Sequence, residues 1–120
     1  MIEEIILEAL GTGTNVNVYM EIPEEQEEQE ESFVVLERTG GGQRGAQMRT
    51  AVFAVQSYAP TLLAAATLNE KVLNVMQNLQ YQENEITTCQ LNSNYNFTDP
   101  ETRRYRYQAV FDLVYFIEEG

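Results

Sequence analysis

The stretch of residues 102–115 restricts the possible fold more than any other part of the chain. Its side chains alternate with a period of two, which is the repeat of a β-strand. One side carries Tyr105, Tyr107, Ala109, Phe111, Leu113 and Tyr115, and the other carries Arg104, Arg106, Gln108, Val110, Asp112 and Val114. A strand of about 11 residues spans roughly 36 Å, so the apolar side requires an extensive core to cover it.

Two segments carry apolar residues at helical spacing. The first covers residues 2–10, and Gly11 and Gly13 are expected to end it. The second begins at Pro60, where a missing N–H costs nothing. Its small residues 64–66 would let another backbone approach closely. Its apolar stripe predicts core packing and consists of Leu62, Ala65, Leu68, Val72, Val75, Met76 and Leu79.

Alternating segments rich in β-formers predict further strands before the final one. These strands cover residues 15–22, 32–39, 49–58 and 85–95. The first three would form an antiparallel meander with two long hairpin loops, of which the glycine-rich loop over residues 40–45 is flexible. The order of one helix, three strands, one helix and two strands predicts an α+β fold. We expect a mixed, mainly antiparallel five-stranded sheet with two helices packed on one face.

The length and composition describe one domain over residues 1–120. The chain has no histidine, no tryptophan and one cysteine, Cys89, so a disulfide within the chain is impossible. A reducing compartment is the natural interpretation. The start lacks the basic residues of a signal peptide, and no apolar run reaches the roughly 20 residues of a membrane helix.

The charge is strongly acidic and unevenly distributed. The formal net charge is −12, with 11 acids and one base in residues 1–42 and 8 acids and 6 bases in residues 43–120. Most of this asymmetry comes from one Glu/Gln run over residues 24–31, which predicts a solvated loop. General affinity for nucleic acid is disfavoured, because phosphates would be repelled.

The residues offer little reactive chemistry. Without histidine there is no conventional acid–base triad and no imidazole metal site. Cys89 lies in a polar strand without an activating partner and is interpreted as a packed thiol. The glycine-rich segments 11–14 and 40–45 lack the Lys-Ser/Thr of a phosphate-binding loop. We therefore expect no catalytic residues, no cofactor and no metal, and a protein that is not an enzyme.

Several local sequences, in this order of elements, resemble a known family. They are Ile22-Pro23-Glu24, the run Phe-Val-Val-Leu-Glu-Arg-Thr-Gly-Gly-Gly over residues 33–42, Val-Gln-Ser-Tyr-Ala-Pro over residues 55–60, and Arg-Tyr-Arg-Tyr-Gln-Ala-Val-Phe over residues 104–111. The chain resembles the tail terminator, or tail-to-head joining, proteins of long-tailed bacteriophages, also called tail completion proteins. The resemblance covers most of the length.

The resemblance implies a structural viral protein of a phage, a prophage or a related particle. Members of that family form homo-oligomeric rings, commonly hexamers, that cap the tail tube and end its polymerisation. The implied partners are the tail tube protein and the head–tail connector protein, and DNA passes through the ring without specific binding. Such a protein would assemble in the host cytoplasm and remain in the virion tail, without contact with a membrane.

A ring requires one patch of each subunit to meet a different patch of its neighbour. The final strand is the leading candidate for one side of this interface. The interface residues proposed from the sequence are Arg103, Arg104, Tyr105 and Arg106, together with Gln43 and Arg44 in the glycine-rich loop. The alternative is that the arginines lie on a solvated face, where exposed ion pairs contribute about 0–1 kcal/mol, and that the loop is only a flexible surface feature.

The acidic run leaves three interpretations open. It could be a solvated loop that aids solubility, a loop at the lumen or rim that repels passing DNA, or a docking loop for a basic patch on a partner. Its residues are Glu24, Glu25, Glu27, Glu28, Glu30 and Glu31. A competing function for so acidic a chain is that of a DNA mimic that inhibits a basic nucleic-acid-binding protein. The near-neutral second part of the chain argues against that alternative.

Overall fold

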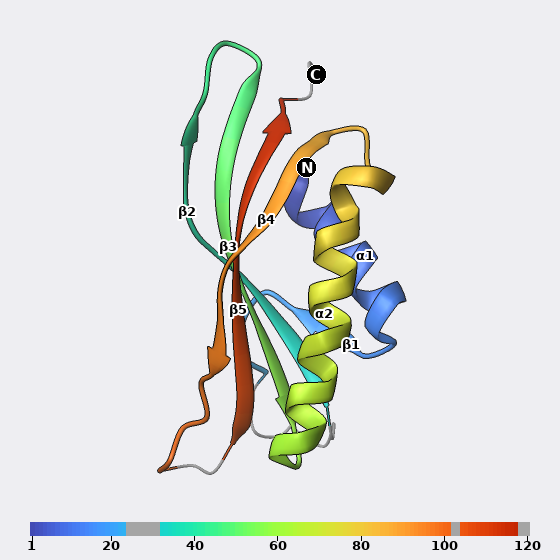
Figure 1. Ribbon diagram of the computed structural model, residues 1–120, viewed down its shortest axis with the longest axis vertical. Coiled ribbons are helices and arrows are strands. Elements are labelled where there is room, and N and C mark those ends of the chain that lie inside the picture. Colours follow the sequence, from blue (N-terminus) through green and yellow to red (C-terminus); the bar gives the residue numbers. More distant parts are fainter. Residues whose placement is uncertain (24–31, 102–103, 118–120) are drawn as a thin grey trace.

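The computed structural model describes residues 1–23, 32–101 and 104–117. Its elements are α1 (Ile2–Thr14), β1 (Asn17–Tyr19), β2 (Phe33–Gln43), β3 (Met48–Ala59), α2 (Leu62–Gln82), β4 (Ile86–Asn96) and β5 (Tyr105–Phe116). The strands form one sheet in the order β1-β2-β3-β5-β4, and both helices cover the same face (Figure 1). The predicted α+β class, the five strands and the order of elements are thereby confirmed.

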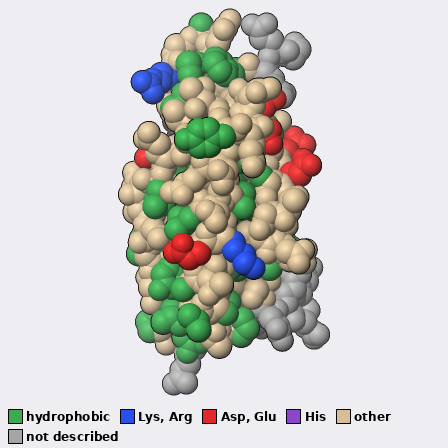
Figure 2. Space-filling model, turned by 45° about the vertical axis from the view of Figure 1, so that its right-hand side comes forward, with side chains coloured by type: hydrophobic (Ala, Val, Ile, Leu, Met, Phe, Trp, Pro, Cys, Tyr) green, Lys and Arg blue, Asp and Glu red, His purple; other side chains and the backbone are tan. Residues whose placement is uncertain are grey.

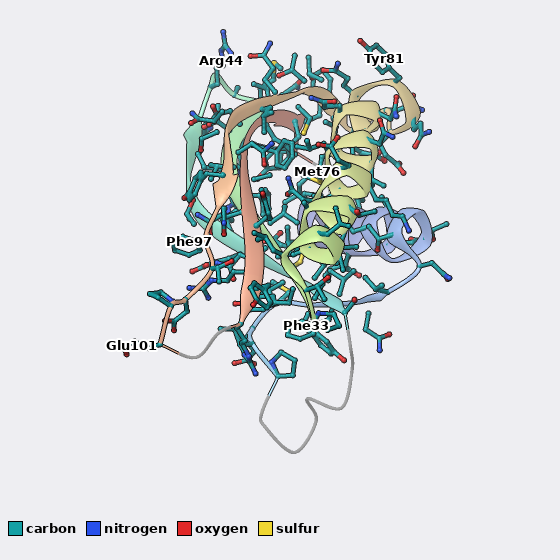
Figure 3. All side chains as sticks on the ribbon, turned by 60° about the horizontal axis from the view of Figure 1, so that its bottom comes forward. Phe33, Arg44, Met76, Tyr81, Phe97 and Glu101 are labelled. Carbon is teal, nitrogen blue, oxygen red and sulfur yellow. The ribbon has the colours of Figure 1, made fainter. Side chains whose placement is uncertain are left out.

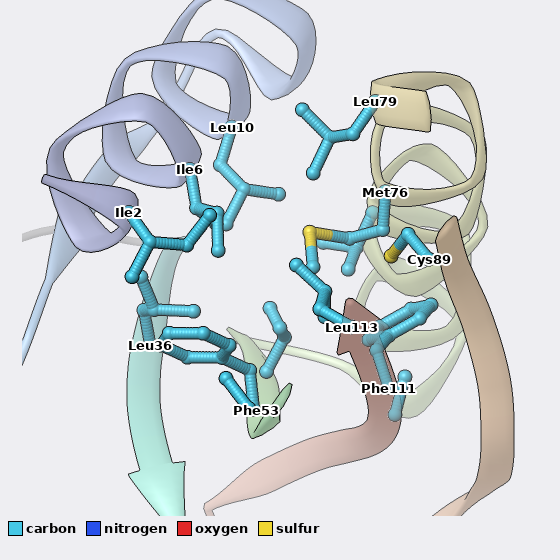
Figure 4. Close-up of a cluster of buried hydrophobic side chains, with 14 of the residues drawn as sticks. Ile2, Ile6, Leu10, Leu36, Phe53, Met76, Leu79, Cys89, Phe111 and Leu113 are labelled. Carbon is cyan, nitrogen blue, oxygen red and sulfur yellow. The ribbon is translucent and has the colours of Figure 1, made fainter. Parts of the chain in front are cut away.

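The core lies between the two helices and the sheet. Its largest fully buried side chains come from every main element, and Figure 4 shows how they converge from α1, α2 and the strands. They include Ile6, Leu10, Leu36, Phe53, Val72, Met76, Leu79, Phe111 and Leu113. The predicted stripe of α2 is therefore confirmed as core from Ala65 to Leu79, whereas Leu62 at its start is exposed. In β5, Tyr105 and Tyr107 are half-buried, beyond the densest part of this core.

The first strand differs from the prediction in length and direction. β1 covers three residues rather than residues 15–22, and it pairs parallel to β2, with Asn17 opposite Phe33 and Tyr19 opposite Val35. The predicted antiparallel meander is therefore wrong for this pair, although β2 and β3 are antiparallel as expected. A hairpin between two strands makes them antiparallel. A parallel pair instead requires a connection that brings the chain back to the start of β2.

Helix α1 does not end where its glycines predicted. It runs through Gly11 and Gly13 to Thr14, and its C-cap Asn15 has a φ of 60°, in the left-handed region. A Cβ built at Gly13 would overlap the Cγ2 methyl of Val75 on α2. Gly13 therefore permits close packing of the two helices rather than stopping the first one.

Helix α2 begins slightly later than predicted. Thr61 is its N-cap, and the Thr61 hydroxyl accepts a hydrogen bond of 3.1 Å from the backbone N–H of Ala64. Such a side-chain cap satisfies one of the free N–H groups at a helix start. Pro60 thus precedes the cap instead of opening the helix, and the helix extends to Gln82.

The glycine-rich segment is also more regular than predicted. β2 continues through Gly40, Gly41 and Gly42 to Gln43, which lies opposite Arg49 of β3. The turn itself is confined to residues 44–47, where the N–H of Arg44 donates to the carbonyl of Met48 at 2.8 Å. We call residues 40–50 the hairpin arm. Figure 1 shows it projecting beyond the helical layer at one end of the molecule.

Candidate subunit interface

The final strand does not lie at an edge of the sheet. β5 is paired with β3 on one side and with β4 on the other, along most of its length. Both rows of its backbone hydrogen-bonding groups are therefore used within the chain. β5 therefore has no free edge along most of its length for pairing with a neighbouring subunit, and its arginines can reach a partner only through the sheet face opposite the helices.

Arg106 lies on the sheet face opposite the helices and is held there by aromatic rings and by oxygen atoms. Its Nε donates to the carbonyl of Phe97 at 2.6 Å, and its Nη1 donates to the hydroxyl of Tyr58 at 2.9 Å. The guanidinium lies 4.4 Å from the ring centroid of Phe97, a cation–π contact. Arg106 is thus an organising residue of its own sheet face, and among the described residues no carboxylate pairs with it.

The other predicted residues near Arg106 have different surroundings. The guanidinium of Arg104 lies 5.8 Å from the Tyr58 ring centroid, next to that of Arg106. Tyr105 pairs with Ala59 across the ladder and is half-buried. Arg103 lies outside the residues that the structure describes. Arg104, Arg106, Tyr58, Tyr95 and Phe97 together form what we call the arginine–aromatic cluster.

A network of amides continues this cluster across three strands. Gln56 of β3 donates to the Oε1 of Gln108 on β5 at 2.8 Å, and Gln108 donates in turn to the hydroxyl of Tyr95 on β4. The hydroxyl of Tyr58 donates to the Oε1 of Gln56 at 3.2 Å. Such connected hydrogen bonds fix side-chain positions on a sheet face.

Most of this cluster was not predicted from the sequence. Tyr58, Tyr95 and Phe97 were not among the predicted interface residues. Their signal was present in part, because Tyr95 and Phe97 follow the two-residue period of a strand. Their meeting with Arg106 depends on the pairing of β4 with β5, which the sequence alone does not reveal.

Gln43 and Arg44 lie far from the arginine–aromatic cluster. They occupy the tip of the hairpin arm, whereas Phe97 and Glu101 lie toward the other end of the molecule (Figures 1 and 3). The molecule measures 45 Å along its longest axis. The residues predicted to form one interface are therefore divided between two separate surfaces.

The two outer edges of the sheet differ from each other. On one side, β1 covers β2 only over residues 33–35, and on the other side no described strand lies beyond β4. Bulges interrupt β2 at Arg38 and β4 near Thr88 and Ser93, so regular edge segments remain at residues 40–43 and 88–91. In the second segment the backbone N–H of Cys89 already donates to the side-chain oxygen of Gln80 at 3.1 Å. β4 contains neither a charged residue nor a proline, the usual features that protect an exposed edge.

Charge is sparse on the side of the molecule formed by α2 and β4. Between Lys71 and Asp99 the sequence contains two charged residues, Glu83 and Glu85, and ten asparagines and glutamines. Figure 2 shows this side with few charged side chains over its middle and acidic side chains gathered along one flank. The predicted acidic loop from Glu24 to Glu31 lies outside the described residues, so its three interpretations stay open.

Cys89 is a packed thiol, as predicted. Its side chain is 2% exposed, and burial, with a smaller effect from the charge of Asp112, raises its pKa from 9.0 to about 12. A thiol with so high a pKa carries almost no thiolate at neutral pH and is a poor nucleophile.

A pocket of about 360 Å³ lies between the start of α1 and the base of the hairpin arm. Two of its lining side chains are engaged with each other, because Arg38 forms an ion pair of 3.6 Å with Glu3 and also donates to the hydroxyl of Tyr115. Among the described residues, no group of three potential metal ligands occurs. The prediction that the chain is not an enzyme stays a prediction.

No helix in the described part of the chain is long and apolar enough to span a membrane. No model of a known protein family matches this chain, and no curated protein matches it.

Proposed function

We propose that this chain is a structural assembly protein of the tail-terminator type, which forms a ring at the end of a phage tail tube. The ring would end the polymerisation of the tube and present a surface to the head connector. The observation that carries this proposal is that, among the described residues, one sheet has two different edges with no strand beyond them, namely β2 past residue 35 with its arm, and β4.

Two unlike sides suit a head-to-tail contact between copies. When one patch meets a different patch, repeated contacts close into a ring if the rotation between copies permits it. The segments that could pair are free of charge, since residues 40–43 are Gly-Gly-Gly-Gln and residues 88–91 are Thr-Cys-Gln-Leu. Uncharged edges matter in a chain of net charge −12, because acidic surfaces of two copies repel each other.

Native mass spectrometry with edge variants tests this proposal. We expect the unmodified chain to form a ring-sized oligomer. Gly42→Glu on the arm and Gln90→Glu on β4 should each prevent assembly, because a charge would be buried at the edge without a partner. Gly42 has room for a side chain, with Thr50 Oγ1 at 3.5 Å from a built Cβ. Thr12→Glu on the exposed side of α1 adds the same charge and should leave the oligomer intact.

A mixture of the two edge variants gives the sharpest result. Each variant retains one intact side, so Gly42→Glu and Gln90→Glu copies should combine as dimers that cannot grow further. A chain that stays monomeric at every concentration, or a dimer that binds a basic nucleic-acid-binding protein, would contradict the ring and favour the DNA-mimic alternative.

A further inference from the structure

A hydrogen bond from β4 to helix α2 lies at the open edge of the sheet. The backbone N–H of Cys89 donates to the Oε1 of Gln80 at 3.1 Å. Gln80 lies near the end of α2, in a groove of about 400 Å³ between α2 and β4 that Gln77 and Leu91 also line. No strand in the described part of the chain lies beyond β4. A side-chain oxygen therefore bonds this N–H where an added strand would offer a carbonyl.

This hydrogen bond falls within the regular part of the β4 edge. Bulges near Thr88 and Ser93 leave residues 88–91 as the regular segment between them. The N–H groups of an edge strand point alternately toward the paired strand and away from it. Since the N–H of Cys89 is bonded to α2, the outward N–H groups of this segment are those of Cys89 and Leu91. Gln80 occupies the first of these two donors.

Gln80 thereby protects an edge that lacks the usual protection. Exposed edge strands commonly carry charged residues or proline, and β4 contains neither. The Oε1 of Gln80 takes the place of the carbonyl of an added strand, at a distance typical of a hydrogen bond between strands. A strand can bond the N–H of Cys89 only after the Gln80 side chain has moved away. We call this hydrogen bond the edge cap.

The edge cap can be exchanged for a contact between strands at little cost. An incoming carbonyl would replace the Oε1 of Gln80 bond for bond, so the N–H of Cys89 would not be left without an acceptor. Gln80 is half-buried, so its released amide can reach water, and its side chain regains rotamer freedom. The edge cap is therefore a reversible closure of β4.

We infer that Gln80 controls assembly by closing the β4 edge of a single copy until residues 40–43 of a second copy pair with residues 88–91. The inference rests on the proposed ring and adds the regulation of its contact. Residues 40–43 suit this role because they are uncharged and β1 covers β2 only over residues 33–35. The edge cap makes pairing depend on a strand that supplies a replacement carbonyl, and it keeps the edges of single copies closed to casual contacts.

Removal of the acceptor tests this control. Gln80→Ala has no acceptor, and Gln80→Asn keeps the amide on a side chain that is one methylene too short to reach Cys89. Both should lower the concentration at half-assembly by roughly three- to tenfold, because the edge is open in every copy. Native mass spectrometry over a concentration series measures this. Gln77→Ala is the matched control, since the Gln77 side chain lines the same groove without a hydrogen bond among the described residues, and it should change nothing.

A stronger acceptor should have the opposite effect. Gln80→Glu offers a carboxylate to the N–H of Cys89, and hydrogen bonds to ionised acceptors are roughly twice as strong as neutral ones. Assembly should then require a higher concentration than it does for the unmodified chain. Gln77→Glu adds the same charge to the same groove without reaching that N–H, so its effect should be smaller. Equal effects of the two glutamates would indicate general repulsion and contradict the edge cap.

Hydrogen exchange at the Cys89 amide separates this inference from the ring itself. In single copies of Gln80→Ala this amide should exchange about tenfold faster than in the unmodified chain, whereas the amide of Gln90, which points toward β5, should be unchanged. In assembled Gln80→Ala, labelled as the oligomer and read after dissociation, the Cys89 amide should again be slow.

Two results would overturn the control by Gln80 and leave the ring intact. One is assembly of Gln80→Ala at the same concentration as the unmodified chain. The other is an oligomer of Gln80→Ala in which the Cys89 amide exchanges as fast as in single copies, because no strand would then have replaced Gln80. Absence of any oligomer, for the unmodified chain and for every variant, would overturn both proposals.

Discussion

Gly13 of α1 and Val75 of α2 touch so closely that no larger side chain fits at Gly13. A built Cβ would overlap the Val75 Cγ2 methyl and lie 3.5 Å from its Cβ. This contact joins the two helices above the sheet, and it explains why glycine occurs inside α1. The close packing of α1 against α2 therefore depends on the absence of a side chain at Gly13.

We expect Gly13→Ala to lower the free energy of unfolding. Overpacking costs about 1–3 kcal/mol, and this exceeds the gain of about 1 kcal/mol from replacing glycine in a helix. Urea denaturation measures the change. Gly11→Ala is the control, since nothing lies within 4 Å of its built Cβ, and it should stabilise the protein. The assigned contact would be contradicted if Gly13→Ala stayed destabilising after Val75→Ala.

Removal of the Tyr58 hydroxyl should destabilise the sheet. Tyr58 is 2% exposed and its hydroxyl both accepts from Arg106 and donates to Gln56. Tyr58→Phe leaves both partners without that bond, at an expected cost of about 1–3 kcal/mol. Tyr95→Phe removes a hydroxyl that is partly accessible to water, so its cost should be smaller. Equal losses in thermal unfolding would argue against a buried network.

The Thr61 cap predicts a pair of opposite effects in α2. Thr61→Ala removes the acceptor for the N–H of Ala64 and should cost about 1 kcal/mol. Thr67 lies inside the same helix, and its hydroxyl donates to the carbonyl of Leu63. Thr67→Ala should be neutral or slightly stabilising, because alanine favours the helix interior. Chemical denaturation of both variants would contradict the cap if Thr61→Ala were neutral.

Cys89 predicts a loss of stability at alkaline pH. Its pKa is raised from 9.0 to about 12 in the folded chain, so the thiol is neutral in both states below pH 9. Above that pH the unfolded chain releases the proton first, and stability falls by about 1.4 kcal/mol per pH unit until about pH 12. Cys89→Ala should lack this component. Urea denaturation of both proteins over about two pH units, from about pH 8.5 to about 10.5, measures this difference in the free energy of unfolding. An equal loss of stability in the two proteins would contradict the raised pKa of Cys89.

The sequence predicted those parts of the fold that follow from local periodicity. The stripe of α2 and the apolar side of β5 from Ala109 onward were confirmed, because one side of each must be covered. The direction of β1 was not predictable in the same way, since it depends on where the chain returns to begin β2.

Glycine was the residue type whose role the sequence predicted least well. Gly11 and Gly13 were expected to end α1. Gly13 is instead required inside the helix by its close contact with Val75 on α2. Gly40–42 were expected to be a flexible loop, although pairing with β3 keeps them in a strand. In both cases a partner distant in sequence decides the conformation, and local propensity does not contain that information.

The candidate interface was predicted only as separate residues. Arg104 and Arg106 were singled out, but their aromatic partners come from β3 and from the end of β4. The groove between α2 and β4 was not predicted from the sequence, although the scarcity of charge between Lys71 and Asp99 was visible there. Its significance depends on α2 and β4 lying side by side, which is a property of the folded chain.

Electron microscopy of the purified chain tests the central claim most directly. Closed rings of uniform size, built from copies that repeat the same contact, are the predicted result. Single copies without any ring, at concentrations where native mass spectrometry is also performed, would contradict the claim that two unlike sides of this sheet join one copy to the next.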